Sequence, residues 1–121
     1  MQSAVQTYGK VARQIATPRE LEANLLLRAA AQLQAVCNDW EECQGGLNEA
    51  LLFNRKLWTI FMTSVADSDN LLPAEIRSNV ANIGLFVMKQ TVAATGQPQP
   101  EKLHSLININ REVAAGLLSN S

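Results

Sequence analysis

The sequence predicts an all-α protein, a small helical bundle of about five helices in which a proline-containing linker precedes the last helix. Leu and Ala are its commonest residues, and both favour helices. Runs of β-branched residues with alternating polarity, which would indicate strands, are missing. With 121 residues, of which 47% are hydrophobic, the chain has enough material for one core. We therefore expect a single domain over residues 1–121, with a bundle over 1–96, a linker over 97–100 and a C-terminal helix over 101–118.

The first predicted helix spans about residues 3–15. Its apolar side chains recur at helical spacing, although Gly9 interrupts the pattern. A helix this short is marginal alone, so it needs contacts elsewhere in the protein. The apolar residues are Val5, Tyr8, Val11, Ala12 and Ile15.

The second predicted helix opens with a strong start signal. Thr17 supplies a capping hydroxyl, Pro18 occupies the first turn, where its missing N–H is harmless, and Glu20 follows three residues after the threonine. We expect this helix to run to about residue 42 and the glycine pair at 45–46 to stop it by supplying a left-handed residue. Its apolar face comprises Leu21, Leu25, Ala29, Leu33, Val36 and Trp40, widened by Leu26, Ala30 and Cys37.

The third and fourth predicted helices cover about residues 47–66 and 72–96, on either side of a solvated turn at 67–70. The third has one apolar face, whereas the fourth has two on nearly opposite sides. A helix with two apolar faces must lie between other helices, either of this chain or of another. The face of the third helix comprises Leu47, Leu51, Leu57, Trp58, Phe61, Met62 and Val65. The faces of the fourth comprise Ile76, Val80, Ile83 and Val87 on one side and Ala81, Leu85, Met88 and Val92 on the other.

The last predicted helix, over about 101–118, follows a segment with Pro98 and Pro100 that should be stiff and extended. Because these prolines separate the helix from the bundle, we expect it to be a functional lid or hook. In the free protein it should fill the site that a client helix would take, or dock on a second copy, and of the two roles we favour contact with the client. Its apolar stripe comprises Leu103, Leu106, Ile107, Val113, Ala114, Leu117 and Leu118.

Composition and charge exclude several functional classes. Charged residues make up 17% of the chain and the net charge is -1, so it lacks the broad basic face that binding to nucleic-acid phosphates requires. No apolar run approaches the roughly 20 residues of a membrane span, and no basic-then-apolar leader begins the chain, so we expect a cytoplasmic protein without a membrane partner. Cys37, Cys43 and His104 are one ligand short of a zinc set, and no glycine-rich phosphate loop occurs. We therefore expect no enzyme activity, no catalytic residues, no metal and no cofactor.

Two asparagines fall inside apolar stripes. Asn54 lies on the face of the third helix and Asn110 on that of the last, where an unpaired amide would be costly, so each should bond to another helix. Each is followed by an arginine, Arg55 or Arg111, a residue suited to interface ion pairs as well as to a solvated helix edge. For Trp58 and its neighbour Phe61, the pattern favours burial in the core over contact with a partner.

Two motifs are distinctive. The block from Asn54 to Phe61 reads Asn-Arg-Lys-Leu-Trp-Thr-Ile-Phe, and the block from Ile109 to Leu117 reads Ile-Asn-Arg-Glu-Val-Ala-Ala-Gly-Leu. Further blocks accompany them in order, namely 17–22 with 29–30, 70–73 and 83–87. Together they resemble the flagellar biosynthesis regulator family called FlaF over most of the chain.

The resemblance implies a small cytoplasmic helical protein that promotes flagellin production and export, acting with flagellin and alongside a second regulator, FlbT, which restrains flagellin synthesis. We expect a non-enzymatic chaperone or adaptor that covers a helical part of flagellin, since sparse charge and a double-faced helix suit recognition of a helix in a groove. Two alternatives stay open: a post-transcriptional regulator acting on flagellin messenger, directly or through FlbT, and a self-associating homo-oligomer. The predicted partner-binding residues are Asn54, Arg55, Trp58, Phe61, Leu85, Met88, Val92, Asn110, Arg111 and Leu117.

Overall fold

The computed structural model describes residues 17–119, so the helix predicted over residues 3–15 lies outside the described residues. Every regular element between residues 17 and 119 is helical, which confirms the all-α fold class. The helices are α2 (Pro18–Asn38), α3 (Trp40–Cys43), the 3-10 turn η1 (Gln44–Gly46), α4 (Leu47–Ala66), α5 (Ala74–Gly96) and α6 (Pro100–Ser119). No helix within this range is long and apolar enough to cross a membrane.

The start of α2 follows the predicted capping pattern, but its end does not. The Glu20 amide donates to Thr17 Oγ1 at 3.1 Å, and Pro18 is the first helical residue. The helix ends at Asn38 rather than near residue 42, because Asp39 leaves the helical region with φ −133° and ψ 52°. The prediction that a glycine supplies a left-handed residue is also wrong, since Gly46 has φ −88° and ψ −5°. With α2 already ended, the glycine pair forms η1 and leads into α4.

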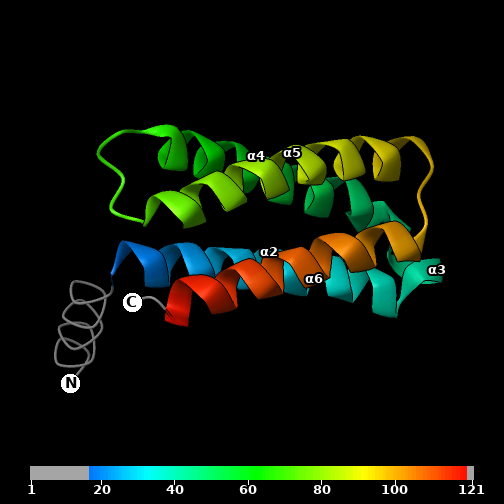
Figure 1. Cartoon of the computed structure of the whole chain (residues 1–121). Helices are drawn as coiled ribbons and strands as arrows, with labels where there is room; N and C mark the ends of the chain where they lie inside the picture. Colours follow the sequence, from blue (N-terminus) through cyan, green and yellow to red (C-terminus); the bar gives the residue numbers. More distant parts are fainter. Residues whose placement is uncertain (1–16, 120–121) are drawn as a thin grey trace, which may run out of the picture.

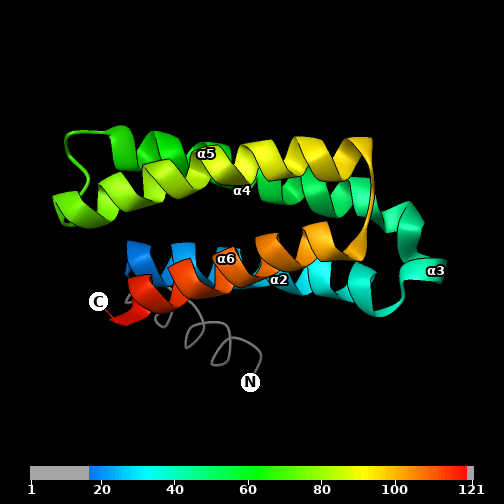
Figure 2. The ribbon, with the colours of Figure 1, turned by 45° about the vertical axis from the view of Figure 1, so that its right-hand side comes forward.

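The four long helices form two antiparallel pairs that pack face to face (Figures 1 and 2). α4 and α5 make one pair, joined at one end of the bundle by residues 67–73. α2 and α6 make the other, although they are far apart in sequence, and α6 packs more extensively on α2 than on α5. The start of α2, the start of α5 and the end of α6 therefore lie at the same end of the bundle (Figure 1).

The connections between helices are held by side chains. Asn70 bridges the turn after α4, because its Nδ2 donates to the Ser64 carbonyl at 3.0 Å and its Oδ1 accepts from the Leu72 amide at 2.9 Å. Lys102 closes the α5–α6 connection, since its Nζ donates to the Gln97 carbonyl at 2.8 Å and to the Ala93 carbonyl at 3.3 Å. The Ser64 and Ala93 carbonyls also accept from the backbone amides of Asp67 and Gln97, so these side chains reinforce helix ends that are already capped.

Small residues set the packing within each pair. α2 turns Ala23, Ala29 and Ala30 inward beside Leu26 and Leu33, which lets α6 approach closely. Most of the predicted face of α2 is buried, but Leu21 and Leu25 at its start are exposed, and Ala23 is buried although it was not predicted. In α5, a Cβ on Gly84 would meet Met62 Sδ at 2.5 Å, so a larger residue at this contact with α4 would require the Met62 side chain to shift.

The C-terminal helix packs into the core, so the prediction that the two prolines isolate it from the bundle is wrong, whereas its role as a lid or hook for a client stays a prediction. Most of the predicted apolar stripe of α6 is buried, mainly against α2, whereas Leu118 is 41% exposed and Val113 is half-buried. The two prolines turn the chain sharply back onto the bundle, so they connect α6 to it instead of isolating it (Figure 2). The buried residues of α6 are Leu103, Leu106, Ile107, Asn110, Ala114 and Leu117.

Candidate functional site: a groove between α5 and α6

A buried polar network ties three helices together at the centre of the bundle. Trp58 Nε1 of α4 donates to Asn110 Oδ1 of α6 at 2.9 Å. Asn110 Nδ2 donates in turn to Asn54 Oδ1 at 2.7 Å and to the Leu26 carbonyl of α2 at 3.2 Å. Asn54 Nδ2 has no hydrogen-bond partner within the described part of the chain. The network confirms that both asparagines bond across helices, and it fixes α6 against α2 and α4.

Burial corrects part of the predicted partner-binding set. The side chains that were expected to touch a partner but lie in the core are Asn54, Trp58, Phe61 and Asn110. Leu117 is buried too, but it lines the groove described below. Trp58 and Phe61 pack edge to face, with ring centroids 5.6 Å apart, in agreement with the predicted preference for burial. An apolar stripe in a sequence marks burial without saying what covers it, and here the other helices of the same chain do so.

The other predicted residues reach the surface. Arg55 and Arg111 are exposed, and Arg111 Nη2 donates weakly to Gln34 Oε1 at 3.5 Å. Leu85 is 60% exposed and Val92 73% exposed on the outer face of α5, with Met88 half-buried beside them. These last three residues form what we call the Leu85 stripe. On the other apolar face of α5, Val80 and Val87 are buried in the core.

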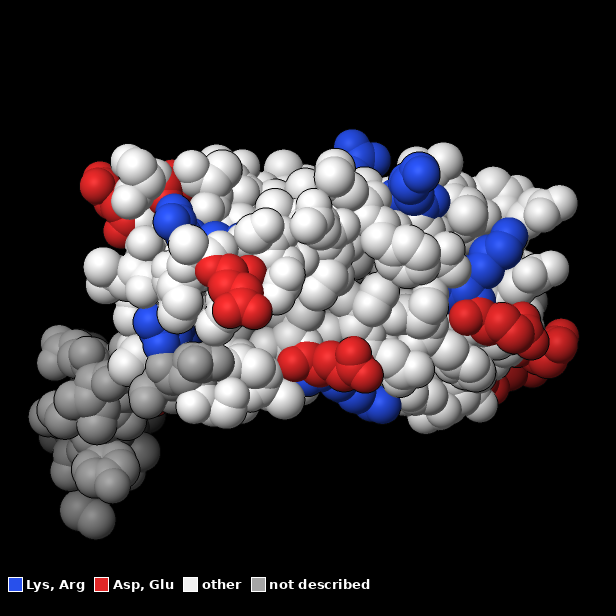
Figure 3. Space-filling model, viewed as in Figure 1, with Lys and Arg blue, Asp and Glu red and all other residues white. Residues whose placement is uncertain are grey.

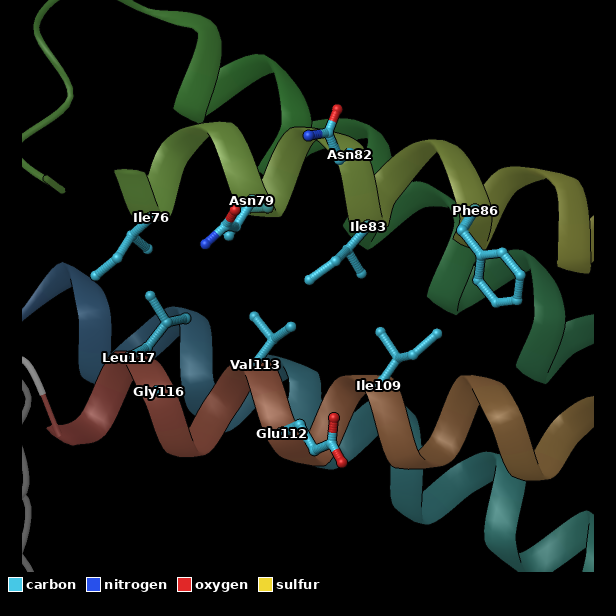
Figure 4. Close-up of a pocket in the computed structure, with 11 residues that line it drawn as sticks. Ile76, Asn79, Asn82, Ile83, Phe86, Ile109, Glu112, Val113, Gly116 and Leu117 are labelled. Carbon is cyan, nitrogen blue, oxygen red and sulfur yellow. The ribbon is translucent and has the colours of Figure 1, made fainter. Parts of the chain in front are cut away.

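The structure also contains a groove that sequence reasoning missed, along the seam between α5 and α6. It has a volume of about 530 Å³. Figure 4 shows Ile76, Ile83 and Phe86 pointing from α5 toward Ile109, Val113 and Leu117 of α6. We call it the α5–α6 groove, and its lining residues are Ile76, Asn79, Val80, Asn82, Ile83, Phe86, Ile109, Glu112, Val113, Gly116 and Leu117.

The two rims of the groove differ in chemistry. On the α5 rim lie the exposed amides of Asn79 and Asn82, and on the α6 rim lies Glu112, the one charged side chain in the lining. Figure 3 shows a mostly uncharged surface over this side of the bundle, with charged residues scattered across it. Gly116 leaves open space beside Glu112, because a Cβ placed on it would meet no atom within 4 Å.

The sequence signal for the groove was present but ambiguous. Ile76 and Ile83 belong to a stripe that also contains fully buried Val87, and Val113 belongs to a stripe with buried Ala114. Helical periodicity places such residues on one side of a helix but does not separate those that meet a neighbour from those beside a gap. The gap arises from the positions of two helices, which no single stripe encodes.

A smaller hollow of about 470 Å³ lies at the start of α2, where Arg19 Nη2 donates to the Leu71 carbonyl at 3.2 Å. Burial raises the pKa of the Glu22 carboxyl in its wall, and nearby Arg19 lowers it by less. Burial also raises the pKa of the Cys37 thiol, helped by the negative charge of Glu101, which disfavours the nucleophilic thiolate. Among residues 17–119, no three His, Cys, Asp or Glu side chains gather as metal ligands would.

Comparison with known proteins places the chain in a family. Neither the curated proteins nor the solved structures contain a match to it. The sequence matches the family described as "Flagellar protein FlaF" over residues 4–117, which includes all of α2, α3, α4 and α5, nearly all of α6, and both walls of the groove. The chain therefore belongs to the FlaF family of flagellar proteins.

Proposed function

We propose that this protein is a non-enzymatic flagellar regulator that binds flagellin as a chaperone or adaptor and so promotes flagellin synthesis and secretion. Membership of the FlaF family supports a role in the flagellum. The observation that carries the proposal is the α5–α6 groove, which is concave and lined mainly by aliphatic and aromatic side chains between two helices. In this proposal an apolar helix of flagellin docks there and is shielded from aggregation until export.

The low charge of the protein favours a protein client over a messenger RNA. The net charge is -1, and neither rim of the groove carries a lysine or arginine. A surface that binds RNA phosphates needs several cations, and its affinity falls steeply as salt rises. Apolar contact in a groove changes much less with salt, so salt dependence separates the two clients.

A substitution at Gly116 tests the site without disturbing the fold. In Gly116→Leu the new side chain extends into open space in the groove, and replacing a helical glycine stabilises α6 by up to about 1 kcal/mol. We expect a melting temperature equal to or above that of wild type and a loss of flagellin affinity of at least tenfold, about 1.4 kcal/mol.

Gly96→Leu is the matched control, because Gly96 ends α5 outside the groove and also has no atom within 4 Å of an added Cβ. Both variants and wild type would be titrated against purified flagellin and would also be used to co-purify it at high salt with nuclease. If the two variants bind flagellin equally well, flagellin does not bind in the α5–α6 groove. Co-purification that nuclease abolishes would replace the protein client with messenger.

A further inference from the structure

The groove has a length and a lining that suit one kind of occupant. Its α5 wall runs from Ile76 to Phe86, ten residue steps, which is about 15 Å or three helical turns. The α6 wall presents Ile109, Val113 and Leu117 at intervals of four residues. An occupant lying along the seam therefore meets apolar side chains from both sides over about three turns.

An extended segment does not suit this lining. The walls are side chains of two helices, whose backbone groups are already bonded within the helices, so a strand would leave its own N–H and C=O groups unpaired against Ile83 and Val113. A helix satisfies these groups internally and offers only side chains to the groove. The lining therefore suits a helix with apolar residues at spacings of three and four better than an extended segment.

Glu112 makes the two rims of the groove differ in charge. It is exposed on the α6 rim, and no hydrogen bond or ion pair engages its carboxylate within residues 17–119. The opposite rim is neutral, with Asn79 and Asn82 as its polar side chains. Next to Glu112, the open space at Gly116 lets a neighbouring backbone approach the carboxylate closely.

We propose that the α5–α6 groove recognises an amphipathic helix that carries a lysine or arginine on one flank, and that Glu112 selects this flank and thereby the orientation of the helix. The proposal deepens the proposed function, since it names the chemistry of the client segment. The cation pairs with Glu112 on the α6 side, and the neutral flank faces the asparagines of α5. A helix with an acidic flank meets like charge at Glu112 and binds less well.

The test uses two synthetic peptides of about three helical turns with the same apolar residues at spacings of three and four. One carries lysines on a flank, and the other carries glutamates at the same positions. Each is titrated by fluorescence anisotropy against the full-length wild type, Glu112→Gln and Glu112→Lys. An ion pair at an exposed rim is worth about a threefold preference, so wild type should prefer the lysine peptide by about that factor.

Glu112→Gln should bind both peptides equally, and Glu112→Lys should prefer the glutamate peptide. Glu49→Gln is the matched control, because it removes the same charge from an exposed position in α4, which contributes no residue to the groove, and it should keep the wild-type preference. A preference that survives in Glu112→Gln would refute the inference, as would equal binding of both peptides by wild type or undiminished binding in Gly116→Leu. Any of these results with intact flagellin binding would leave the proposed function standing, whereas failure to bind flagellin would overturn that function separately.

Discussion

The buried network makes an asymmetric prediction about its two asparagines. Asn110 uses both ends of its amide, since it accepts from Trp58 and donates to Asn54 and to the Leu26 carbonyl. Asn54 uses one end only, because its Nδ2 is buried without a partner. Replacing each asparagine with leucine, which has a similar size, should therefore have very different effects on stability.

In Asn110→Leu, the Trp58 indole N–H and Asn54 Oδ1 each lose the one partner that the structure gives them. A buried polar group left unpaired costs about 1–3 kcal/mol, so the loss should be about 2–6 kcal/mol. That is a large part of the roughly 5–15 kcal/mol that stabilises an ordinary domain. We expect a strongly lowered urea midpoint.

In Asn54→Leu, two terms of similar size oppose each other. Asn110 loses one acceptor, but the unpaired Nδ2 of Asn54 is removed from the core. The net change should be within about 1 kcal/mol. Urea unfolding followed by circular dichroism measures both variants, and an unchanged m-value shows that the midpoints report stability. If Asn54→Leu costs as much as Asn110→Leu, then Asn54 Nδ2 has a partner and the reasoning is wrong.

The other predictions concern the core, the C-terminal helix, pH and the outer face of α5. Trp58→Ala should lower the free energy of unfolding by about 3–5 kcal/mol, and an unchanged melting temperature would contradict its burial. Truncation after Gly96 should unfold the whole bundle, seen as lost helical circular dichroism, because α6 covers α2. Since burial raises the folded-state pKa of Glu22, its ionisation is disfavoured in the folded protein, so stability attributable to this group falls as pH rises above 4.5. Glu22→Gln should therefore raise the urea midpoint at about pH 7 and lose that advantage at about pH 3. Leu85→Asp should keep the wild-type circular dichroism and melting temperature, whereas Val87→Asp should unfold the chain, and the reverse result would mean that the faces of α5 are misassigned.

Much of the fold follows from local signals in the sequence. The Thr17 cap, the bounds of α4 and the solvated turn before α5 each depend on residues close together in the chain, and each agrees with the structure. The end of α2 was harder to predict, because the apolar periodicity continues to Trp40 while the backbone of Asp39 leaves the helix. Apolar periodicity indicates which face of a helix is buried. It does not show where the backbone leaves the helical conformation.

The candidate site depends on contacts between residues that are far apart in the sequence, which local patterns do not predict. Asn110 and Trp58 were predicted on apolar stripes and also as partner contacts, and the structure buries both. The hydrogen bond between them joins positions 52 residues apart, which no local pattern reports. Phe86 and Glu112 belong to different helices, and only the tertiary packing of α5 beside α6 makes them members of one groove. The expectation that α6 would stand apart was wrong because two prolines were interpreted as a separator when they form a tight return.

The groove results from where the bundle makes its close contacts. Gly84 draws α5 against α4 at Met62, while the alanines of α2 and the network around Asn110 draw α6 against α2. The close contacts of α5 and of α6 thus lie on the sides that face away from the groove. The space between Ile83 and Val113 stays open. Walls held in this way need little rearrangement to accept a helix, so binding loses less free energy to ordering than it would on a mobile surface. The same packing explains why a change inside the network should weaken the groove indirectly, through the position of α6, whereas a change at Gly116 should block it directly.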